Sequence, residues 1–315
     1  MSNQAGLVFI KPGFLSLLQD AGRKGVMHMG LTSGGAMDRH AWAWANRLMG
    51  NSYDSAALEI TFGSVEFTSE LDTWIAVTGA SAPCSINGIQ QPLWTALPVR
   101  AGDTVTIGAP KTGIRSYLAV AGGFQIETGL GGSCANFVRE GIGGVRGDGR
   151  PLKEGDRLPC LVGQPSIKSR KVPEAWQPDY KEELNLAVIP CAQIDRFPAR
   201  VLHTFFTNTY TLSPQTDRMG ARIKGPELEV RGTSLISEGT SLGAIQVPAD
   251  GQPIILLNDR QTIGGYPKLG AVTPRSLDAL AQRPPGTKLR FRATTLHEAQ
   301  LEEQRFLRFF HGLSL

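Results

Sequence analysis

Residues 239–270, GTSLGAIQVPADGQPIILLNDRQTIGGYPKLG, decide our interpretation of the fold. The run PIILL at 253–257 contains no polar residue, which is typical of a strand buried on both faces. Polar residues follow at 258–262 (NDRQT), and then comes Gly264-Gly265, which permits positive φ and close approach of a ligand. A buried strand that ends in a glycine-hinged polar loop commonly presents a functional site. A solvated turn at a strand end has the same pattern, so both interpretations stay open.

Short strand patterns separated by turn residues recur on both sides of this stretch. Residues 84–86 and 89–91 flank Asn87-Gly88, the strongest two-residue signal for a β-hairpin. Turn signals at such regular intervals are typical of a barrel or sandwich rather than of alternating strand–helix units. We therefore predict a mainly β chain with few helices.

Two helices have clear sequence signatures. Residues 38–49 carry apolar residues at helical spacing, and Asp38 is a favourable N-cap. Near the C-terminus, Thr295 and Glu298 form a capping box that predicts the start of a terminal helix. Four apolar residues of that helix are expected to be buried: Leu296, Ala299, Phe306 and Phe310.

The length of 315 residues and one shift in composition predict two subdomains. Residues 163–183, GQPSIKSRKVPEAWQPDYKEE, are rich in proline and charge, which indicates a linker. We place the N-terminal β subdomain at residues 1–170 and the C-terminal β subdomain, with its terminal helix, at residues 171–315.

Composition argues against several classes of protein. The net charge is only +4, and the densest basic run, at 168–171, has no interleaved aromatic residues, so nucleic-acid binding is disfavoured. No apolar stretch approaches a membrane span and no signal pattern opens the chain, so we expect a soluble, cytoplasmic protein without membrane partners. The four cysteines form no C-x-x-C pair and the five histidines are scattered, so we predict no metal site.

Two glycine-containing segments resemble functional motifs without matching them. Residues 239–243 fit G-x-S-x-G, but a strand pattern follows them, whereas a nucleophile elbow opens a helix. Residues 129–150 are glycine-rich and suit either a ligand-binding loop or a long surface crossover, of which we favour the crossover. Neither segment contains a phosphate-binding motif, and no P-loop occurs elsewhere.

Charged and polar residues in glycine-rich turns are the remaining candidates for chemistry. Asp259 can serve as a general base or orient one, and Arg218, Arg23 and Lys268 can hold a carboxylate or another anion. Surface salt bridges, which contribute little to stability, would produce the same composition. The full set of such residues is Asp20, Arg23, Asp38, Arg39, Arg218, Asp259, Gln261 and Lys268.

Six motifs stand out along the chain: QDAGR at 19–23, GGAMD at 34–38, ALEI at 57–60, RSYLAVAGG at 115–123, DRMG at 217–220 and NDRQTIGGYPK at 258–268. In this order they resemble one family over about residues 5–292, the family of KipA and the C subunit of 5-oxoprolinase. That family is similar to biotin-dependent carboxyltransferases and is related to one half of the urea carboxylase carboxyltransferase domain. At one turn many relatives carry Gly-Pro-Gln, whereas this chain has Cys191-Ala192-Gln193, which puts the role of that turn in doubt.

The resemblance implies a fold, a reaction and partners. It implies two cyclophilin-like β-barrel subdomains and a complex with two other subunits, one KipI-like and one larger and ATP-using. The implied reaction is the ATP-dependent opening of 5-oxo-L-proline to L-glutamate, a hydrolysis of a cyclic amide that is active only in the complex. Because the chain lacks a P-loop, we expect it to bind no cofactor of its own.

Two other functions stay open. One is a carboxyltransferase component of the urea carboxylase type, which would need a partner that carries biotin, since this chain has no Met-Lys-Met acceptor. The other is a non-catalytic regulator of the KipA type that binds a KipI-like protein.

For the site we predict a pocket shared with a partner protein. Its catalytic residues would be Asp259, Gln261 and Lys268, and its substrate-binding residues Arg218, Tyr266, Arg23 and Asp38.

Overall fold

Strands dominate the structure, which confirms the predicted mainly β fold. The computed structural model describes residues 4–163, 167, 169–232 and 235–312, so Lys168 of the basic run lies outside the described residues. The chain forms two compact units. The first comprises Met1–Lys24 and Gly34–Lys181, and the second comprises Gly25–Ser33 and Glu182–Leu315. The boundary that we predicted after residue 170 lies within the first unit.

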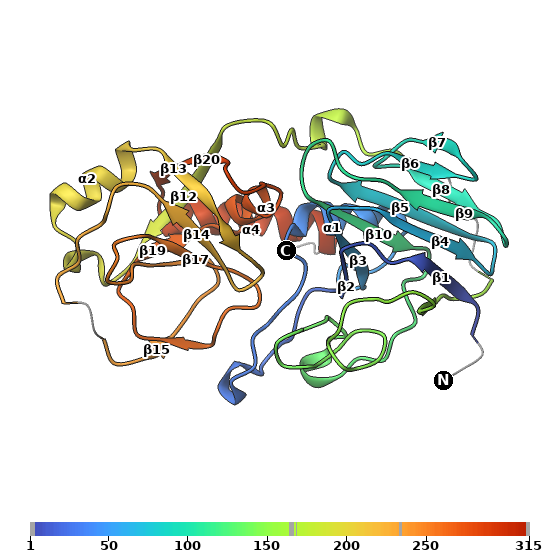
Figure 1. Cartoon of the computed structure of the whole chain (residues 1–315), viewed down its shortest axis with the longest axis horizontal. Helices are drawn as coiled ribbons and strands as arrows, with labels where there is room; N and C mark the ends of the chain where they lie inside the picture. The colour runs from blue at the N-terminus through green and yellow to red at the C-terminus, as the bar shows by residue number, and fades with distance from the viewer. Residues whose placement is uncertain (1–3, 164–166, 168, 233–234, 313–315) are drawn as a thin grey trace. The chain divides into compact units, whose positions relative to one another are not determined.

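The first unit is built from two antiparallel sheets. The six-stranded sheet has the order β11 (Arg157–Pro159), β1 (Gly6–Lys11), β4 (Val65–Ser69), β9 (Thr104–Ile107), β6 (Cys84–Ile86) and β7 (Ile89–Gln91). The five-stranded sheet has the order β2 (Leu15–Gln19), β3 (Ala57–Thr61), β10 (Arg115–Val120), β5 (Thr73–Gly79) and β8 (Ala96–Val99). Figure 1 labels the strands of this sheet.

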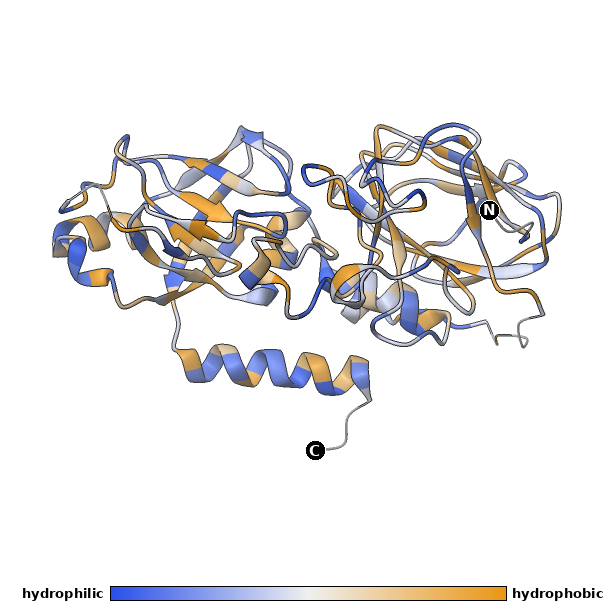
Figure 2. Cartoon of the chain, turned by 90° about the horizontal axis from the view of Figure 1, so that it is seen from below, coloured by the Kyte–Doolittle hydropathy of each residue, from blue (hydrophilic) through white to orange (hydrophobic). Residues whose placement is uncertain are grey.

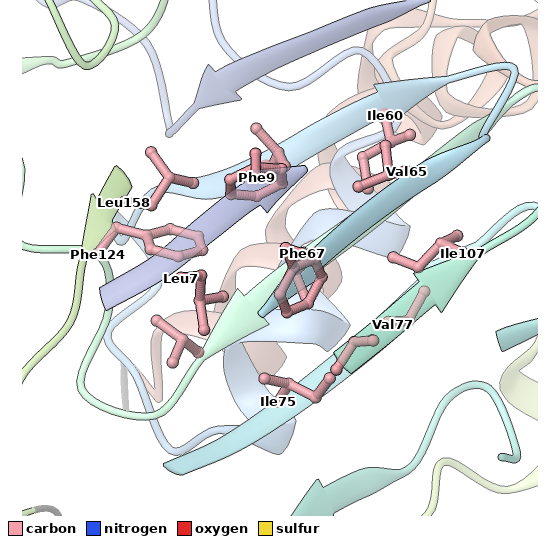
Figure 3. Packing of buried hydrophobic residues seen from close by; sticks show 14 of the residues in the cluster. Leu7, Phe9, Ile60, Val65, Phe67, Ile75, Val77, Ile107, Phe124 and Leu158 are labelled. Atoms are coloured by element: carbon pink, nitrogen blue, oxygen red, sulfur yellow. The ribbon is translucent and has the colours of Figure 1, made fainter. Parts of the chain in front are cut away.

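Both sheets contribute to one hydrophobic core (Figure 3). The alternation in β4 is clear, because Val65 and Phe67 are fully buried while Glu66 and Thr68 are half-buried. Phe67 lies 5.3 Å from Phe9 of β1, measured between ring centroids. These side chains meet others from the second sheet, including Ile60, Ile75 and Val77.

Two local predictions for this unit are confirmed. Asn87 (φ 51°) and Gly88 (φ 79°) form the tight turn between β6 and β7, as a type I′ hairpin requires. Helix α1 covers Arg39–Leu48, and the Asp38 side chain accepts a hydrogen bond from the Ala41 N–H at 3.0 Å. Local sequence therefore determines both elements.

The strands of the second unit close into a barrel (Figure 1). The predicted buried strand is observed as β17, where Ile255 and Leu256 are buried and pair with the two neighbouring strands. A separate two-stranded ribbon joins β15 (Glu238–Gly239) to β18 (Ile263–Gly264). The order around the barrel is β12 (Leu184–Pro190), β19 (Lys268–Val272), β16 (Ala244–Gln246), β17 (Ile254–Leu256), β14 (Gly220–Lys224), β13 (Tyr210–Thr216) and β20 (Lys288–Ala293).

Three helices accompany the barrel strands: α2 (Ala199–Thr207), α3 (Pro274–Ala281) and α4 (Leu296–His311). The predicted capping box opens α4, and hydrophobic and hydrophilic residues alternate along this helix in Figure 2. No helix within the described part of the chain is long and apolar enough to span a membrane. The described residues also form four short 3-10 helices: Met27–Met29, Leu130–Gly132, Glu174–Trp176 and Ile194–Arg196.

The predicted buried stripe of α4 is wrong at its first position. Ala299 and Phe306 are buried and Phe310 is half-buried, but Leu296 is exposed. The helix contacts α3, where the Arg275 guanidinium lies 3.5 Å from the Phe306 ring centroid. Leu296 belongs to the first turn, about 15 Å along the axis from this contact. Tertiary packing therefore covers only part of the apolar face.

Candidate functional site

A buried ion pair lies at the end of the predicted strand. The strand β17 is followed by the turn Asn258-Asp259, and Asp259 meets Arg218 from the turn between β13 and β14. Arg218 Nε donates to Asp259 Oδ2 at 2.8 Å and Nη2 donates to Oδ1 at 3.1 Å. The Asp259 N–H also donates to the Arg218 carbonyl at 2.8 Å. Backbone pairing thus fixes both turns, and a bidentate contact neutralises both buried charges.

A segment distant in sequence contacts the same loop. Gly25–Ser33 belongs to the second unit, where the Thr32 hydroxyl donates to the Asn258 carbonyl at 2.9 Å. Arg260 is also buried, and its Nε donates to the Thr240 carbonyl at 3.3 Å. Burial lowers the pKa of Arg260. The first part of the polar loop, residues 258–260, is therefore enclosed within the unit, whereas residues 261–266 are half-buried or exposed.

Lys268 forms a second charged cluster at the start of β19. Its side chain is buried, and Nζ donates to Glu238 Oε1 on the ribbon strand β15. Gln193 Nε2 donates to the same oxygen, while Gln193 Oε1 accepts from the Lys268 N–H at 2.8 Å. The hydrogen bond from Lys268 holds the pKa of Glu238 below its ordinary value of 4.5. The turn at Cys191-Ala192-Gln193, whose role the sequence left in doubt, therefore supports Lys268.

The other residues of this loop make fewer polar contacts. The Gln261 carbonyl accepts a hydrogen bond from the Thr240 hydroxyl, and Tyr266 is 46% exposed. Gly264 and Gly265 do not adopt positive φ, which corrects one reason that we gave for the glycine pair. Crowding explains them instead, because a Cβ would lie 2.7 Å from Gln246 Nε2 at Gly264 and 2.9 Å from the Leu235 carbonyl at Gly265.

Arg23 lies in the first unit and is surrounded by the glycine-rich segment. Its Nη2 donates to the Ala135 carbonyl at 2.5 Å, and a Cβ at Gly143 would come within 3.0 Å of Nη2 and within 2.0 Å of that carbonyl. Asp20 anchors the same segment by accepting from the Ser133 hydroxyl at 2.7 Å and from the Cys134 N–H at 2.8 Å. Because residues 133–137 are buried, our prediction of a surface crossover is wrong for the middle of this segment.

Asp38 belongs to a buried polar network in the first unit. Besides capping α1, its carboxylate accepts from the Tyr180 hydroxyl at 3.1 Å, and its N–H donates to the Tyr117 oxygen at 2.8 Å. The Tyr117 hydroxyl donates to Glu59 Oε2 at 2.8 Å, and Arg115 Nε lies 3.8 Å from Glu59 Oε1. Burial raises the pKa of Tyr117 well above its ordinary value, so it stays protonated. We name Asp38, Glu59, Arg115, Tyr117 and Tyr180 the Glu59 network.

The structure brings together only some of the predicted site residues. Arg218 and Asp259 contact each other, whereas the ion-pair partner of Lys268 is Glu238, which the sequence analysis missed. No motif signals that pairing, since Glu238 lies on a two-residue strand far along the chain from Lys268. Among the residues that the structure describes, no group of three His, Cys, Asp or Glu side chains is placed to hold a metal ion.

Comparison with known proteins identifies the family. Residues 29–293 match the family model "Carboxyltransferase domain, subdomain A and B". The chain is 36% identical to the C subunit of 5-oxoprolinase of Escherichia coli over 98% of this chain and 97% of that protein. It is 33% identical to the Haemophilus influenzae protein of the same name over 90% and 89% of the two chains.

A solved structure of a larger protein contains the same fold. The crystal structure of the K. lactis urea amidolyase matches 100% of this chain with a TM-score of 0.91 and 25% sequence identity. This chain covers 21% of that protein, so it corresponds to about one fifth of a longer polypeptide. The predicted family resemblance is confirmed, and the chain belongs to the family of carboxyltransferase domains with subdomains A and B.

Proposed function

We propose that this chain is one component of an ATP-dependent complex that opens 5-oxo-L-proline to L-glutamate. One observation carries the proposal, namely the 36% identity to the C subunit of E. coli 5-oxoprolinase, which extends over nearly the full length of both chains. A match of this extent includes both units and all the turns that hold candidate residues. The similarity to the H. influenzae protein of the same name covers 90% of the chain and supports the same function.

The reaction explains why other subunits are needed. Ring opening adds water across the lactam C–N bond, so that the carbonyl carbon becomes a carboxylate and the nitrogen becomes an amine. A lactam is a resonance-stabilised amide, and coupling to ATP hydrolysis supplies the driving force. This chain has no P-loop motif. We therefore assign ATP to a larger partner and expect a second, KipI-like partner to complete the complex.

The charged groups of the second unit suit a small anionic amide. Lys268 supplies a buried ammonium group for the carboxylate of the substrate. Asp259 is held in a single orientation by Arg218, as a base or an orienting group must be. We keep Gln261 as a catalytic candidate and Tyr266 as a substrate-binding candidate, since Tyr266 is half-exposed.

Arg23 and Asp38 are weaker candidates for direct contact with the substrate. Both are more than nine-tenths buried and hydrogen-bonded within the first unit. Binding a substrate directly would require them to exchange these bonds. We propose that they act by fixing the glycine-rich segment and the N-terminus of α1.

Reconstitution tests the proposed function. The isolated chain should neither hydrolyse ATP nor release glutamate from 5-oxo-L-proline, while the chain mixed with its ATP-using and KipI-like partners should do both. The control is the same mixture without this chain. Glutamate release at an equal rate in that control would show that this chain is not required for the reaction. ATP-coupled release by the isolated chain would contradict our assignment of ATP to a larger partner.

A second candidate function is carboxyl transfer. The family model favours it, because its description is that of a carboxyltransferase domain. Biotin would then arrive on a partner, since the chain has no Met-Lys-Met acceptor sequence. Transfer of labelled carboxyl from a biotinylated carrier to urea, with no glutamate release in the reconstituted complex, would favour this alternative.

A further inference from the structure

Two polar side chains lie on the outer face of the barrel in the second unit. In the strand register, Ile245 pairs with Ile255, and Ile255 pairs with Ala221 of β14; all three are fully buried and face the interior. The next position along β16 is Gln246, whose cross-strand partners are Ile254 and Lys268. The β16–β19 register shifts between Ile245, which pairs with Gly270, and Gln246, so that Leu269 is passed over and Lys268 lies opposite Gln246. Paired residues of neighbouring strands share a face. Gln246 and Lys268 are therefore neighbours on the face opposite to the core.

The ribbon formed by β15 and β18 covers this outer face. Gly264 of the ribbon lies so close to Gln246 that a Cβ would be 2.7 Å from Gln246 Nε2. The Thr240 N–H donates to the Thr262 carbonyl at 2.9 Å and the Leu235 N–H donates to the Gly265 carbonyl at 3.2 Å, so pairing continues beyond the two strands. Gln246 is consequently only 1% exposed although it faces away from the core.

Three side-chain donors gather under and beside this ribbon. Lys268 Nζ and Gln193 Nε2 both donate to one oxygen, Glu238 Oε1. Gln246 Nε2 has no hydrogen-bond partner among the residues that the structure describes. A buried donor without an acceptor destabilises a fold and calls for an explanation. A ligand oxygen that binds there in the working protein would supply one.

Glu238 is the least fixed member of the cluster. It lies on a strand of two residues that pairs with β18, and its side chain is 50% exposed. By contrast, the side chain of Lys268 is 10% exposed and belongs to a barrel strand. The donors are thus built into the barrel and the adjacent turn, while the acceptor is on an exposed edge. A carboxylate from outside can replace such an acceptor at little cost to the fold.

We propose that this cluster is a carboxylate-binding site which Glu238 occupies as an internal counterion until a ligand displaces it. In the bound state Lys268 Nζ, Gln193 Nε2 and Gln246 Nε2 would donate to the two oxygens of the incoming carboxylate, which have enough lone pairs for all three. The identity of the ligand as 5-oxo-L-proline or L-glutamate rests on the proposed function, but the existence of the site does not.

The proposal predicts that removing the charge of Glu238 strengthens binding. Glu238→Gln keeps the shape and removes the competing carboxylate. If Glu238 leaves the site open one tenth of the time, the variant should bind carboxylates about tenfold more tightly. A matched control is Glu229→Gln, which removes the same charge from another exposed ion pair, with Arg200, and should leave the affinity unchanged.

Gln246→Leu separates a ligand contact from a structural role. The substitution keeps the approximate volume and removes the donor that has no acceptor among the described residues. The variant should be at least as stable as the wild type, because no hydrogen bond of Nε2 is lost. Its affinity for carboxylates should nevertheless fall by about tenfold, as loss of a hydrogen bond to a charged ligand predicts. If Gln246 had only a structural role, Gln246→Leu would not weaken binding while leaving the stability unchanged.

Titration calorimetry on the chain of 315 residues provides the test. The probes are 5-oxo-L-proline, L-glutamate, acetate, and 2-pyrrolidinone, which has the lactam ring without a carboxylate. We expect the Glu238→Gln variant to tighten binding of at least one carboxylate and not of 2-pyrrolidinone. Tighter binding of acetate without binding of 5-oxo-L-proline would support the site and count against the proposed function. Equal affinities of the wild type and Glu238→Gln for every carboxylate, or no binding by either, would overturn the proposal.

Discussion

The Glu59 network of the first unit and the Lys268–Glu238 cluster of the second unit each pair a carboxylate with a cation. They differ in how the chain holds the carboxylate. Glu59 is 1% exposed and belongs to β3, which lies inside a five-stranded sheet. The Glu238 side chain is 50% exposed and belongs to a two-residue strand outside the barrel.

The partners of the two carboxylates differ in the same way. Glu59 Oε2 accepts from the Tyr117 hydroxyl and from the Met37 N–H at 2.9 Å, so a sheet strand and the segment before α1 depend on it. Glu238 Oε1 accepts from the side chains of Lys268 and Gln193. Gln193 is also held by a separate hydrogen bond, which the Lys268 N–H donates to Gln193 Oε1. We infer that a buried carboxylate hydrogen-bonded to regular elements supports the fold, whereas an exposed carboxylate on a short edge strand can be replaced by the carboxylate of a ligand.

Replacing each carboxylate by alanine should give the largest difference in stability between the two clusters. Glu59→Ala removes the buried carboxylate that Arg115 and the Tyr117 hydroxyl face, and we expect the free energy of unfolding to fall by about 3–5 kcal/mol. Glu238→Ala removes an exposed ion pair and should change it by about 1 kcal/mol or less. Denaturant titration measures both values.

Fluorescence can assign the loss to one unit. All five tryptophans lie in the first unit, so their emission follows the unfolding of that unit alone, while circular dichroism follows both. The Glu59→Ala midpoint should shift in the fluorescence trace and the Glu238→Ala midpoint should not. Equal losses for the two variants would mean that exposure on a short strand does not distinguish the clusters.

Asp259 is a third carboxylate that can be compared with the other two. It is buried like Glu59 but belongs to the candidate site. If Asp259 faced only a pocket, Asp259→Asn would change the stability little. Its buried bidentate contact with Arg218 changes this expectation. We now expect the free energy of unfolding to fall by about 1.5–3 kcal/mol, as for a lost hydrogen bond between charged groups. Glutamate release by the reconstituted complex should fall by about 100-fold or more if Asp259 acts in the chemistry.

A double variant separates the two roles of this ion pair. Arg218→Met with Asp259→Leu replaces both charges by apolar side chains, which often restores stability to a buried pair. The double variant should be more stable than Asp259→Asn and equally inactive. Recovery of glutamate release together with stability would show that the pair only supports the fold.

Elements with strong local signals could be predicted from the sequence. The N-cap Asp38, the turn Asn87-Gly88 and the apolar run before Asn258 each act within a few residues, and each formed the predicted element. In the same way, the capping box at Thr295 predicted where α4 begins. Burial along α4 could not be predicted, because it depends on where the helix packs against α3.

The candidate site could be predicted as a set of residues but not as contacts. The polar loop after β17 and the turn that carries Arg218 both stood out as sequence motifs, yet their bidentate pairing depends on the β14–β17 register. The Lys268–Glu238 pairing depends on a separate ribbon that no periodicity indicates. The glycine pair was recognised, but crowding by Gln246 is a tertiary cause that the sequence does not reveal.

The smallest expected effect concerns the titration of Glu238. The hydrogen bond from Lys268 lowers the pKa of Glu238 below 4.5, so the ion pair stabilises the fold above that pH and is lost as the pH falls through the lowered value. Because the carboxylate is half-exposed, solvent screens the pair, and its loss should change the free energy of unfolding by only a few tenths of a kcal/mol.

A carboxyl carbon NMR titration detects this small effect better than unfolding does. In the wild type the Glu238 signal should titrate with a midpoint below 4.5, and in Lys268→Met the midpoint should return to the ordinary range because the ammonium group is gone. Saturating acetate should have the same effect as Lys268→Met if the ligand displaces Glu238 from Lys268. An unchanged Glu238 midpoint in saturating acetate would place the bound acetate elsewhere, and Glu238 would then be as permanent a partner as Glu59.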